Sequence, residues 1–130
     1  MFADASALVA IIAFEPERDA LLDRMAAEAR VLWSAMSCWE TVSSLRRARG
    51  ITPATARREV ERAAEDLELS LVSVGPQELN IALDAYERYG RNSGHRAKLN
   101  MGDCFAYACA KANGARLLYK GNDFAHTDLA

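Results

Sequence analysis

Four acidic residues of this 130-residue chain stand beside apolar segments, at places where a strand would end or a helix would begin. They are Asp4, Glu40, Asp103 and Asp123, and Asp128 is a fifth acid nearby in the sequence. Open α/β sheets bind their ligands at the carboxyl ends of the strands. We therefore expect these acids, distant in the sequence, to converge on one pocket.

Carboxylates gathered in one cleft are suited to a divalent cation. They repel one another unless a cation neutralises them, and Mg²⁺ takes oxygen ligands at about 2.1 Å. A bound metal ion can polarise a phosphoryl oxygen, activate a water and stabilise the leaving oxygen. No covalent nucleophile is then required, and we find no Ser-His-Asp or Cys-His arrangement. The acids therefore favour metal-dependent phosphodiester hydrolysis.

Each acid also has a purely structural interpretation. Asp4 is placed to cap the helix that follows it. Ser37 and Glu40 have the spacing of a capping box, and Asn100 is placed to cap a helix with Asp103 in its first turn, where a carboxylate favours the helix dipole. Taken together, the apolar neighbours of Asp4 and Asp103 favour a site, because ionised groups are costly to place among apolar residues.

The elements that would position these acids alternate along the chain. Pro16, Thr52-Pro53, Gly75-Pro76 and Asn113-Gly114 mark helix ends and starts. Strands are predicted at 1–3, 30–35, 69–74 and 116–119, and helices at 6–14, 17–28, 37–50, 52–68, 76–89 and 101–113. Residues 120–130 are predicted as a loop with one helical turn. This alternation predicts a parallel sheet with helices on both faces.

Composition sets the class of protein. The length fits a single domain over residues 1–130, and 51% hydrophobic residues exclude a disordered chain. A net charge of −2 argues against charge-driven wrapping of nucleic acid. Three cysteines do not make a disulfide framework, and the apolar run 7–14 is far shorter than the ~20 residues that span a bilayer. We expect a cytoplasmic protein whose thiols are small buried side chains.

Four stretches resemble a known family. They are DASALVA (4–10), SCWE (37–40), LNMGDCFAYA (99–108) and LLYKGNDF (117–124). Together they resemble a PIN domain, and most closely the VapC toxins of toxin–antitoxin pairs. The resemblance extends over nearly the whole chain, and the 99–108 stretch is its most specific part.

The resemblance implies a fold, an activity and partners. The fold would be a three-layer α/β/α sandwich around a parallel sheet. The activity would be that of an endoribonuclease that depends on Mg²⁺, or on Mn²⁺ as a substitute, and acts on tRNA or rRNA with a metal-activated water. A VapB-type antitoxin would bind near the active cleft. A homodimer and larger toxin–antitoxin assemblies would be expected.

The family motifs also imply roles for individual residues. Asp4 and Asp103 would be the core metal ligands, and Glu40 the third acid, bound directly or through water. Ser6 would support the metal shell or a phosphate oxygen, or else serve only as a hydroxyl at a helix start.

The fourth acid is left open by the sequence. Many PIN domains place it two residues before the Asp-Phe pair, and that position is Gly121 here. Either Asp123 or Asp128 takes its place, or three acids suffice.

Basic residues lie close to the acids in the sequence. The segment 86–98 leads to Asp103 and contains Arg91, Arg96 and Lys98, which we expect to contact RNA phosphates. The alternative is an ordinary solvated loop. A second cluster, interpreted mostly as surface ion pairs, consists of Arg46, Arg47, Arg49, Arg57, Arg58 and Arg62.

The aromatic residues have two interpretations each. Tyr86 and Tyr89 either stack on unpaired bases or pack on the core. Trp33, Trp39 and Phe105 are interpreted as core or dimer contacts.

Other α/β classes fit less well. A catalytically inactive PIN-like partner-binding module would not need Asp4, Glu40 and Asp103 together. A phosphoacceptor receiver domain carries adjacent acids after its first strand, whereas Asp4 stands alone. A haloacid-dehalogenase-type phosphatase requires Asp-x-Asp, and position 6 is Ser.

Overall fold

A computed structural model describes all residues, 1–130. Its four strands are β1 (Phe2–Ala3), β2 (Leu32–Ser34), β3 (Ser70–Val72) and β4 (Leu117–Leu118). Its six helices are α1 (Ala5–Ile12), α2 (Arg18–Ala26), α3 (Ala35–Arg49), α4 (Pro53–Asp66), α5 (Pro76–Tyr89) and α6 (Met101–Ala112). Every predicted strand and helix is present, although the strands are shorter than predicted. Residues 120–130 form turns rather than a helical turn.

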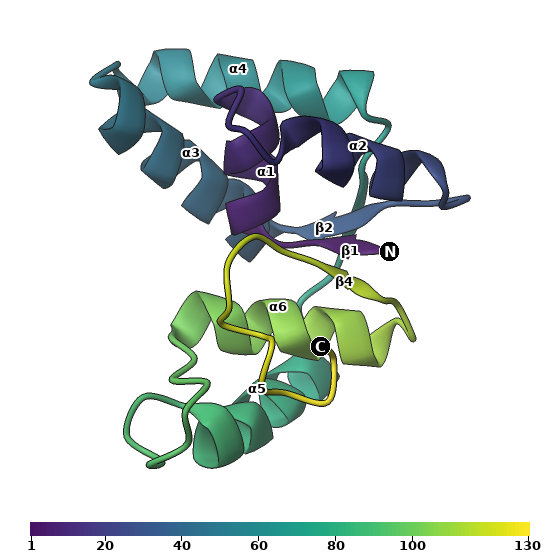
Figure 1. Cartoon of the computed structure of the whole chain (residues 1–130), viewed down its shortest axis with the longest axis vertical. Helices are drawn as coiled ribbons and strands as arrows, with labels where there is room; N and C mark the ends of the chain where they lie inside the picture. Colours follow the sequence, from purple (N-terminus) through teal and green to yellow (C-terminus); the bar gives the residue numbers. More distant parts are fainter.

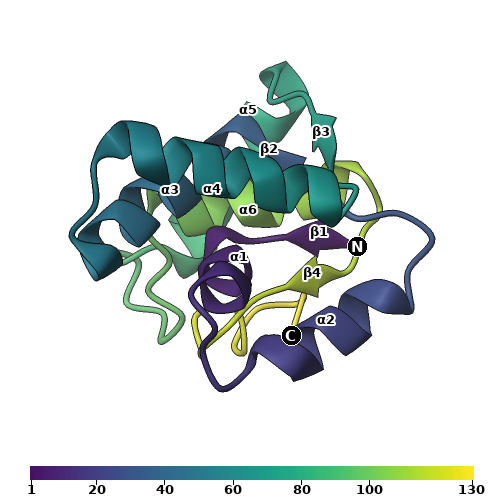
Figure 2. The same cartoon turned by 90° about the horizontal axis from the view of Figure 1, so that it is seen from above.

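The sheet has the order β3-β2-β1-β4, and all of its pairs are parallel. Helices α1 to α4 cover one face, and α5 and α6 cover the other (Figure 1). Figure 2, viewed from the α4 side, shows α4 lying across the sheet with α1 seen end-on below it and α2 beyond β4. The predicted three-layer α/β/α sandwich is confirmed. None of the helices is both long and apolar enough to cross a bilayer.

The strands feed two separate cores because successive residues point to opposite faces of the sheet. Phe2 and Leu117 pack toward α5 and α6, in a core that includes Leu99 and Phe124. Their neighbours Ala3 and Leu118 pack toward α1 to α4, in a core with Leu8, Leu45 and Val60. A short strand buried on both faces is apolar throughout, which is why no alternating polar pattern marks these segments.

Helix α3 begins two residues earlier than predicted. Its N-cap is Ser34, whose hydroxyl accepts from the Ser37 amide at 3.2 Å, and its last turn ends at Gly50, which has a left-handed φ of 62°. The predicted Ser37–Glu40 capping box is therefore wrong, and so is the placement of Glu40 in the first turn. Glu40 lies in the second turn, and its carboxylate has no capping role.

Helix α6 begins as predicted. The Asn100 side chain accepts from the Asp103 amide at 2.9 Å, and the Asp103 carboxylate accepts from the Asn100 amide at 2.8 Å. This reciprocal pair is a capping box, which fixes Asp103 in the first turn.

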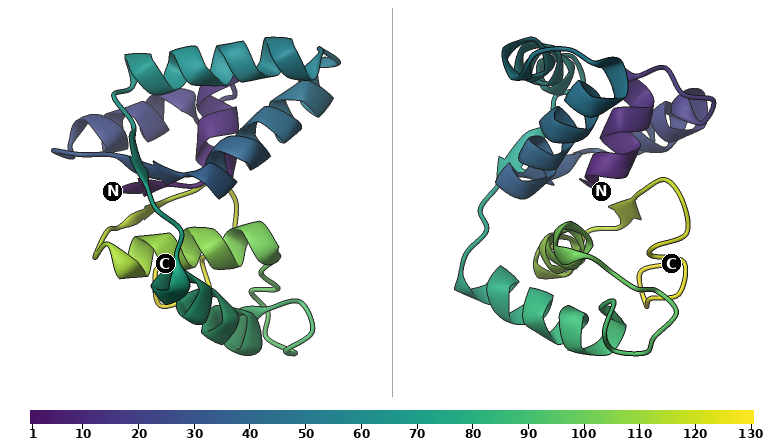
Figure 3. Two further views of the ribbon diagram at one scale, coloured as in Figure 1. Left: turned by 180° about the vertical axis from the view of Figure 1, so that it is seen from behind. Right: turned by 90° about the vertical axis from the view of Figure 1, so that its left-hand side faces the viewer.

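Two irregular segments flank α6. The loop 90–100 is closed by a bridge between Gly90 and Leu99. The C-terminal tail runs past α6 (Figure 3) and is tied to it by Asp128, which accepts from the Tyr107 hydroxyl at 2.7 Å and from Lys111 Nζ at 2.6 Å.

Candidate active site

The predicted acids share one pocket of about 320 Å³. It lies where β1 and β2 lead into α1 and α3, beside the start of α6 and the segment after β4. The lining residues are Asp4, Ala5, Ser6, Val9, Glu15, Glu40, Ser44, Asn100, Asp103 and Asp123. The expected convergence of Asp4, Glu40, Asp103 and Asp123 is thus what the structure shows.

Asp4 is the most deeply buried acid of the pocket, with 5% of its surface exposed. Its Oδ2 accepts from the Ser6 amide at 2.9 Å and from the Ser6 hydroxyl at 2.5 Å. The Ser6 hydroxyl in turn accepts from the Lys120 amide at 3.0 Å. The predicted capping role of Asp4 is confirmed, and Ser6 links this acid to the segment that follows β4.

Three carboxyl groups of the pocket, those of Asp4, Glu40 and Asp103, have raised pKa values. Burial raises the pKa of Glu40 to about 7, and the negative charges of Asp4 and Asp103 add to the effect. Burial likewise raises the pKa of Asp103 to about 6, against the opposing hydrogen bond from the Asn100 amide. Burial also raises the pKa of Asp4. Repelling carboxyl groups at reduced solvation are the environment that a cation would relieve.

The donor set fits a hard divalent cation, because oxygen ligands of high negative charge are what Mg²⁺ and Mn²⁺ take. The side chains are not arranged as a closed cage, since no three acidic, histidine or cysteine side chains stand where they could hold one ion jointly. Joint ligation therefore requires side-chain movement. Glu40 is suited to such movement because no hydrogen bond from the protein holds its carboxyl group.

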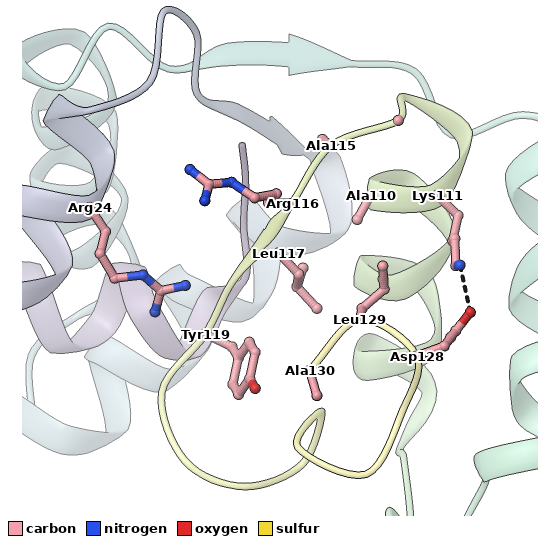
Figure 4. A pocket seen from close by; sticks show the side chains of 11 residues that line it. Arg24, Ala110, Lys111, Ala115, Arg116, Leu117, Tyr119, Asp128, Leu129 and Ala130 are labelled. Carbon is pink, nitrogen blue, oxygen red and sulfur yellow. Dashed lines mark hydrogen bonds and ion pairs between the residues drawn. The ribbon is translucent and has the colours of Figure 1, made fainter.

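Asp128 does not belong to this pocket. It borders a separate cavity of about 510 Å³ beside β4, where its carboxylate is paired with Lys111 (Figure 4). The hydrogen bonds from Lys111 and Tyr107 hold the pKa of Asp128 below its usual value, although partial burial opposes them. Of the two candidates for a fourth acid, only Asp123 lines the acidic pocket.

Sequence reasoning missed Glu15, a further acid in the pocket lining. Glu15 follows α1 and forms an ion pair with Lys120, which also lies 3.4 Å from Glu17. The chain turns back at Phe14, which has a φ of 57°, before Glu15. The local sequence does not predict that turn, because an aromatic residue rarely adopts a positive φ and phenylalanine is not a typical turn residue.

The basic loop is only partly beside the pocket. Arg91 is close enough for its charge to oppose the upward shift in the pKa of Asp103. Arg96 and Lys98 are exposed and do not line the acidic pocket. In the second arginine cluster, Arg49 pairs with Glu59, and Arg57 pairs with Glu61 at 2.6 Å.

The aromatic residues divide between the core and the surface. Tyr89 is buried and packs edge-on against Tyr107, with ring centroids 5.8 Å apart, whereas Tyr86 is half exposed. Trp33 is in the core as predicted. The core interpretation of Trp39 is wrong, since 69% of its surface is exposed.

The comparisons with known proteins identify the class. The family model described as "PIN domain" matches residues 1–129. The chain therefore belongs to the PIN domain family.

Relatives place it within that family. It is 40% identical to a VapC ribonuclease of Rhizobium meliloti, over 98% of each chain. It is 39% identical to ribonuclease VapC30 of Mycobacterium tuberculosis, over 100% of this chain and 96% of that one. Accordingly, the chain is one of the VapC ribonucleases.

A solved structure supports the fold. Mycobacterium tuberculosis VapC20, described as a sarcin–ricin loop cleaving toxin, aligns with a TM-score of 0.77 at 17% identity. The alignment covers 99% of this chain and 95% of that one. At this identity the likeness concerns the fold alone.

The raised pKa values predict how the stability of the metal-free protein depends on pH. Glu40 and Asp103 bind protons more tightly in the folded chain than in the unfolded chain, where their pKa values return to about 4.5 and 3.8. Their contribution to stability is complete below those ordinary values and is lost as the pH rises through about 6 and 7. Thermal denaturation in chelator should therefore give a lower Tm at about pH 8 than at about pH 5.

The Glu40→Gln variant is the control for this pH dependence. Removing the Glu40 carboxyl group should flatten the decline in Tm between about pH 4.5 and pH 7, its ordinary and its raised pKa. A metal-free Tm that rises over this range would contradict the proposed electrostatics of the pocket.

Proposed function

We propose that this ribonuclease hydrolyses RNA phosphodiester bonds with Mg²⁺, or Mn²⁺ in its place, held by Asp4, Asp103 and Glu40. The observation that supports the proposal most is the shared pocket, in which three carboxyl groups have raised pKa values. A divalent ion there would offset both their repulsion and their loss of hydration.

The chain's own residues would orient the reaction. When bound, the metal supplies an activated water and neutralises charge on the phosphoryl group. Ser6 holds the Asp4 carboxylate, and the Asn100 amide holds one oxygen of Asp103, so both acids are oriented before RNA arrives. Asp123 is exposed at the pocket edge, where its carboxylate can accept a proton from an attacking water or hold a second cation through water.

We further propose that the chain is the toxin of a VapBC-type pair, inhibited by a VapB-type antitoxin that binds near this pocket. The VapC names of its relatives support this assignment. The proposed substrates are structured RNAs of the tRNA or rRNA class.

The metal proposal is tested by Asp103→Asn. The amide cannot supply a charged ligand, although its oxygen can still accept from the Asn100 amide, so the fold should persist. Cleavage of total tRNA and rRNA should fall by at least about a hundredfold. Activity of the wild-type protein should vanish in EDTA and return with Mg²⁺ or Mn²⁺.

The matched control is Asp128→Asn, which neutralises an acid outside the pocket. It should leave cleavage within about twofold of wild type and lower stability by about 1 kcal/mol, through its weakened contacts with Tyr107 and Lys111. Undiminished cleavage by the Asp103→Asn protein would remove Asp103 from the mechanism, and full activity in chelator would exclude the metal.

We propose that Arg91, Arg96 and Lys98 bind the RNA backbone beside the pocket. Changing all three to Gln should weaken RNA binding and reduce the slope of log affinity against log salt by about 2. Filter binding over a series of salt concentrations measures that slope. An unchanged slope would mean that the loop does not contact phosphates. Changing Arg24, Arg30 and Arg58 to Gln removes the same charge from residues outside the acidic pocket lining and is the control.

A homodimer is also proposed, from an apolar stripe on α5. Leu79, Leu83 and Tyr86 recur at helical spacing with 47%, 56% and 50% of their surfaces exposed. With the exposed Met101, they line an apolar pocket of about 480 Å³ between α5 and α6. Contiguous exposed apolar surface of this kind marks interaction sites.

The dimer is tested by Leu83→Glu, which places a charge in the stripe. Sedimentation analysis should show a dimer for the wild-type protein and a monomer for the variant, because an unpaired buried carboxylate is costly. Gln77→Glu makes the same change in charge on another face of α5 and should remain dimeric. A monomeric wild-type protein would contradict the proposal.

A further inference from the structure

Gly102 lies next to Asp103 in the sequence and against Glu40 in the structure. A side chain at this position would collide with the Glu40 carboxyl group. Gly102 is the second residue of α6, is buried and directly precedes Asp103. A Cβ built on Gly102 would lie 1.8 Å from Oε1 of Glu40, 2.3 Å from its Cδ and 2.4 Å from its Oε2. The Glu40 carboxyl group therefore occupies the space that any side chain at this position would fill.

The backbone of Gly102 gives no other reason for glycine. Its φ is not among the positive values found at Gly50, Gly94, Gly114 and Gly121. Glycine is a poor helix former, so alanine would be preferred at a helical position without other demands. The close approach of Glu40 is the demand that the structure shows.

Hydrogen bonds hold Asp4 and Asp103 in the pocket, whereas the position of Glu40 depends on its close packing against Gly102. Asp4 is held by Ser6, and Asp103 is held by the Asn100 amide. Glu40 reaches the pocket from the second turn of α3, and its carboxyl group rests against the first turn of α6.

We propose that Gly102 is a positioning residue: its missing side chain admits the Glu40 carboxyl group into the acidic pocket. The proposed metal-binding function adds a consequence, namely that any side chain at position 102 displaces the third acid from the cation. The geometric part of the inference does not depend on that function.

The Gly102→Ala variant separates positioning from folding. The displaced atoms are the end of a flexible side chain, so the variant should fold, with a Tm within a few degrees of wild type. A crystal structure of the metal-free variant should show the Glu40 carboxyl group outside the pocket. Mn²⁺ affinity, measured by calorimetry, should fall by about 10–100-fold, toward that of Glu40→Ala.

Two double variants test whether Gly102 acts through Glu40. In the Glu40→Ala background, Gly102→Ala should not reduce Mn²⁺ affinity further, and it should raise the Tm by about 2–4 °C because the clash is gone and alanine favours the helix. In the Gly102→Ala background, Glu40→Asp should recover part of the Mn²⁺ affinity because its shorter side chain leaves room. The same Glu40→Asp change in wild type should weaken binding.

Gly75→Ala is the matched glycine control, since its Cβ would meet only a side chain at 3.6 Å, an ordinary contact. It should bind Mn²⁺ like wild type. A Gly102→Ala crystal structure with Glu40 unmoved would overturn the inference, as would an equal loss of affinity with and without Glu40. If wild type itself binds no Mn²⁺, the metal function fails, while the crystal structure still decides the positioning role.

Discussion

Burial of carboxyl groups that the sheet brings to one edge, together with their mutual repulsion, is the constraint on which this site depends. The parallel strands β1 and β2, buried on both faces, send the chain into α1 and α3 at the same edge. The acids that follow are therefore partly dehydrated and close together, which is why the pKa values of Glu40 and Asp103 are raised. Something must hold these groups in place against a force that favours their separation.

Helix capping supplies that restraint for two of the acids. Asp4 and Asp103 each use one carboxylate oxygen, Oδ2, to accept from an amide at the start of α1 or α6. Capping and site formation looked like competing interpretations in the sequence, but one carboxylate serves both. A capping hydrogen bond contributes about 0.5–2 kcal/mol to stability. This stabilisation is lost if the carboxylate moves away, and it therefore holds Asp4 and Asp103 in place against their repulsion.

The sequence was sufficient for the alternation of elements, the parallel sheet and the meeting of Asp4, Glu40, Asp103 and Asp123. Apolar periodicity and turn residues mark the elements, and the carboxyl ends of parallel strands meet at one edge of a sheet. The sequence failed where the answer depended on tertiary contacts. Ser37 matches a capping box, yet Ser34 at the end of β2 caps α3. Glu15 reaches the pocket only because the chain turns at Phe14. The exposure of Trp39 depends on which face of α3 meets the core, and its weak helical pattern does not settle that.

Glu40 differs from the other buried acids in what restrains it. Burial and the charges of Asp4 and Asp103 raise its pKa, and no hydrogen bond offsets them. Its place is set by the space above Gly102 and by the backbone of α3. Since no three side chains are arranged to hold one ion, some group must move when a cation binds. The capped acids would lose hydrogen bonds by moving, whereas Glu40 would lose none, so adjustment to a cation falls on Glu40.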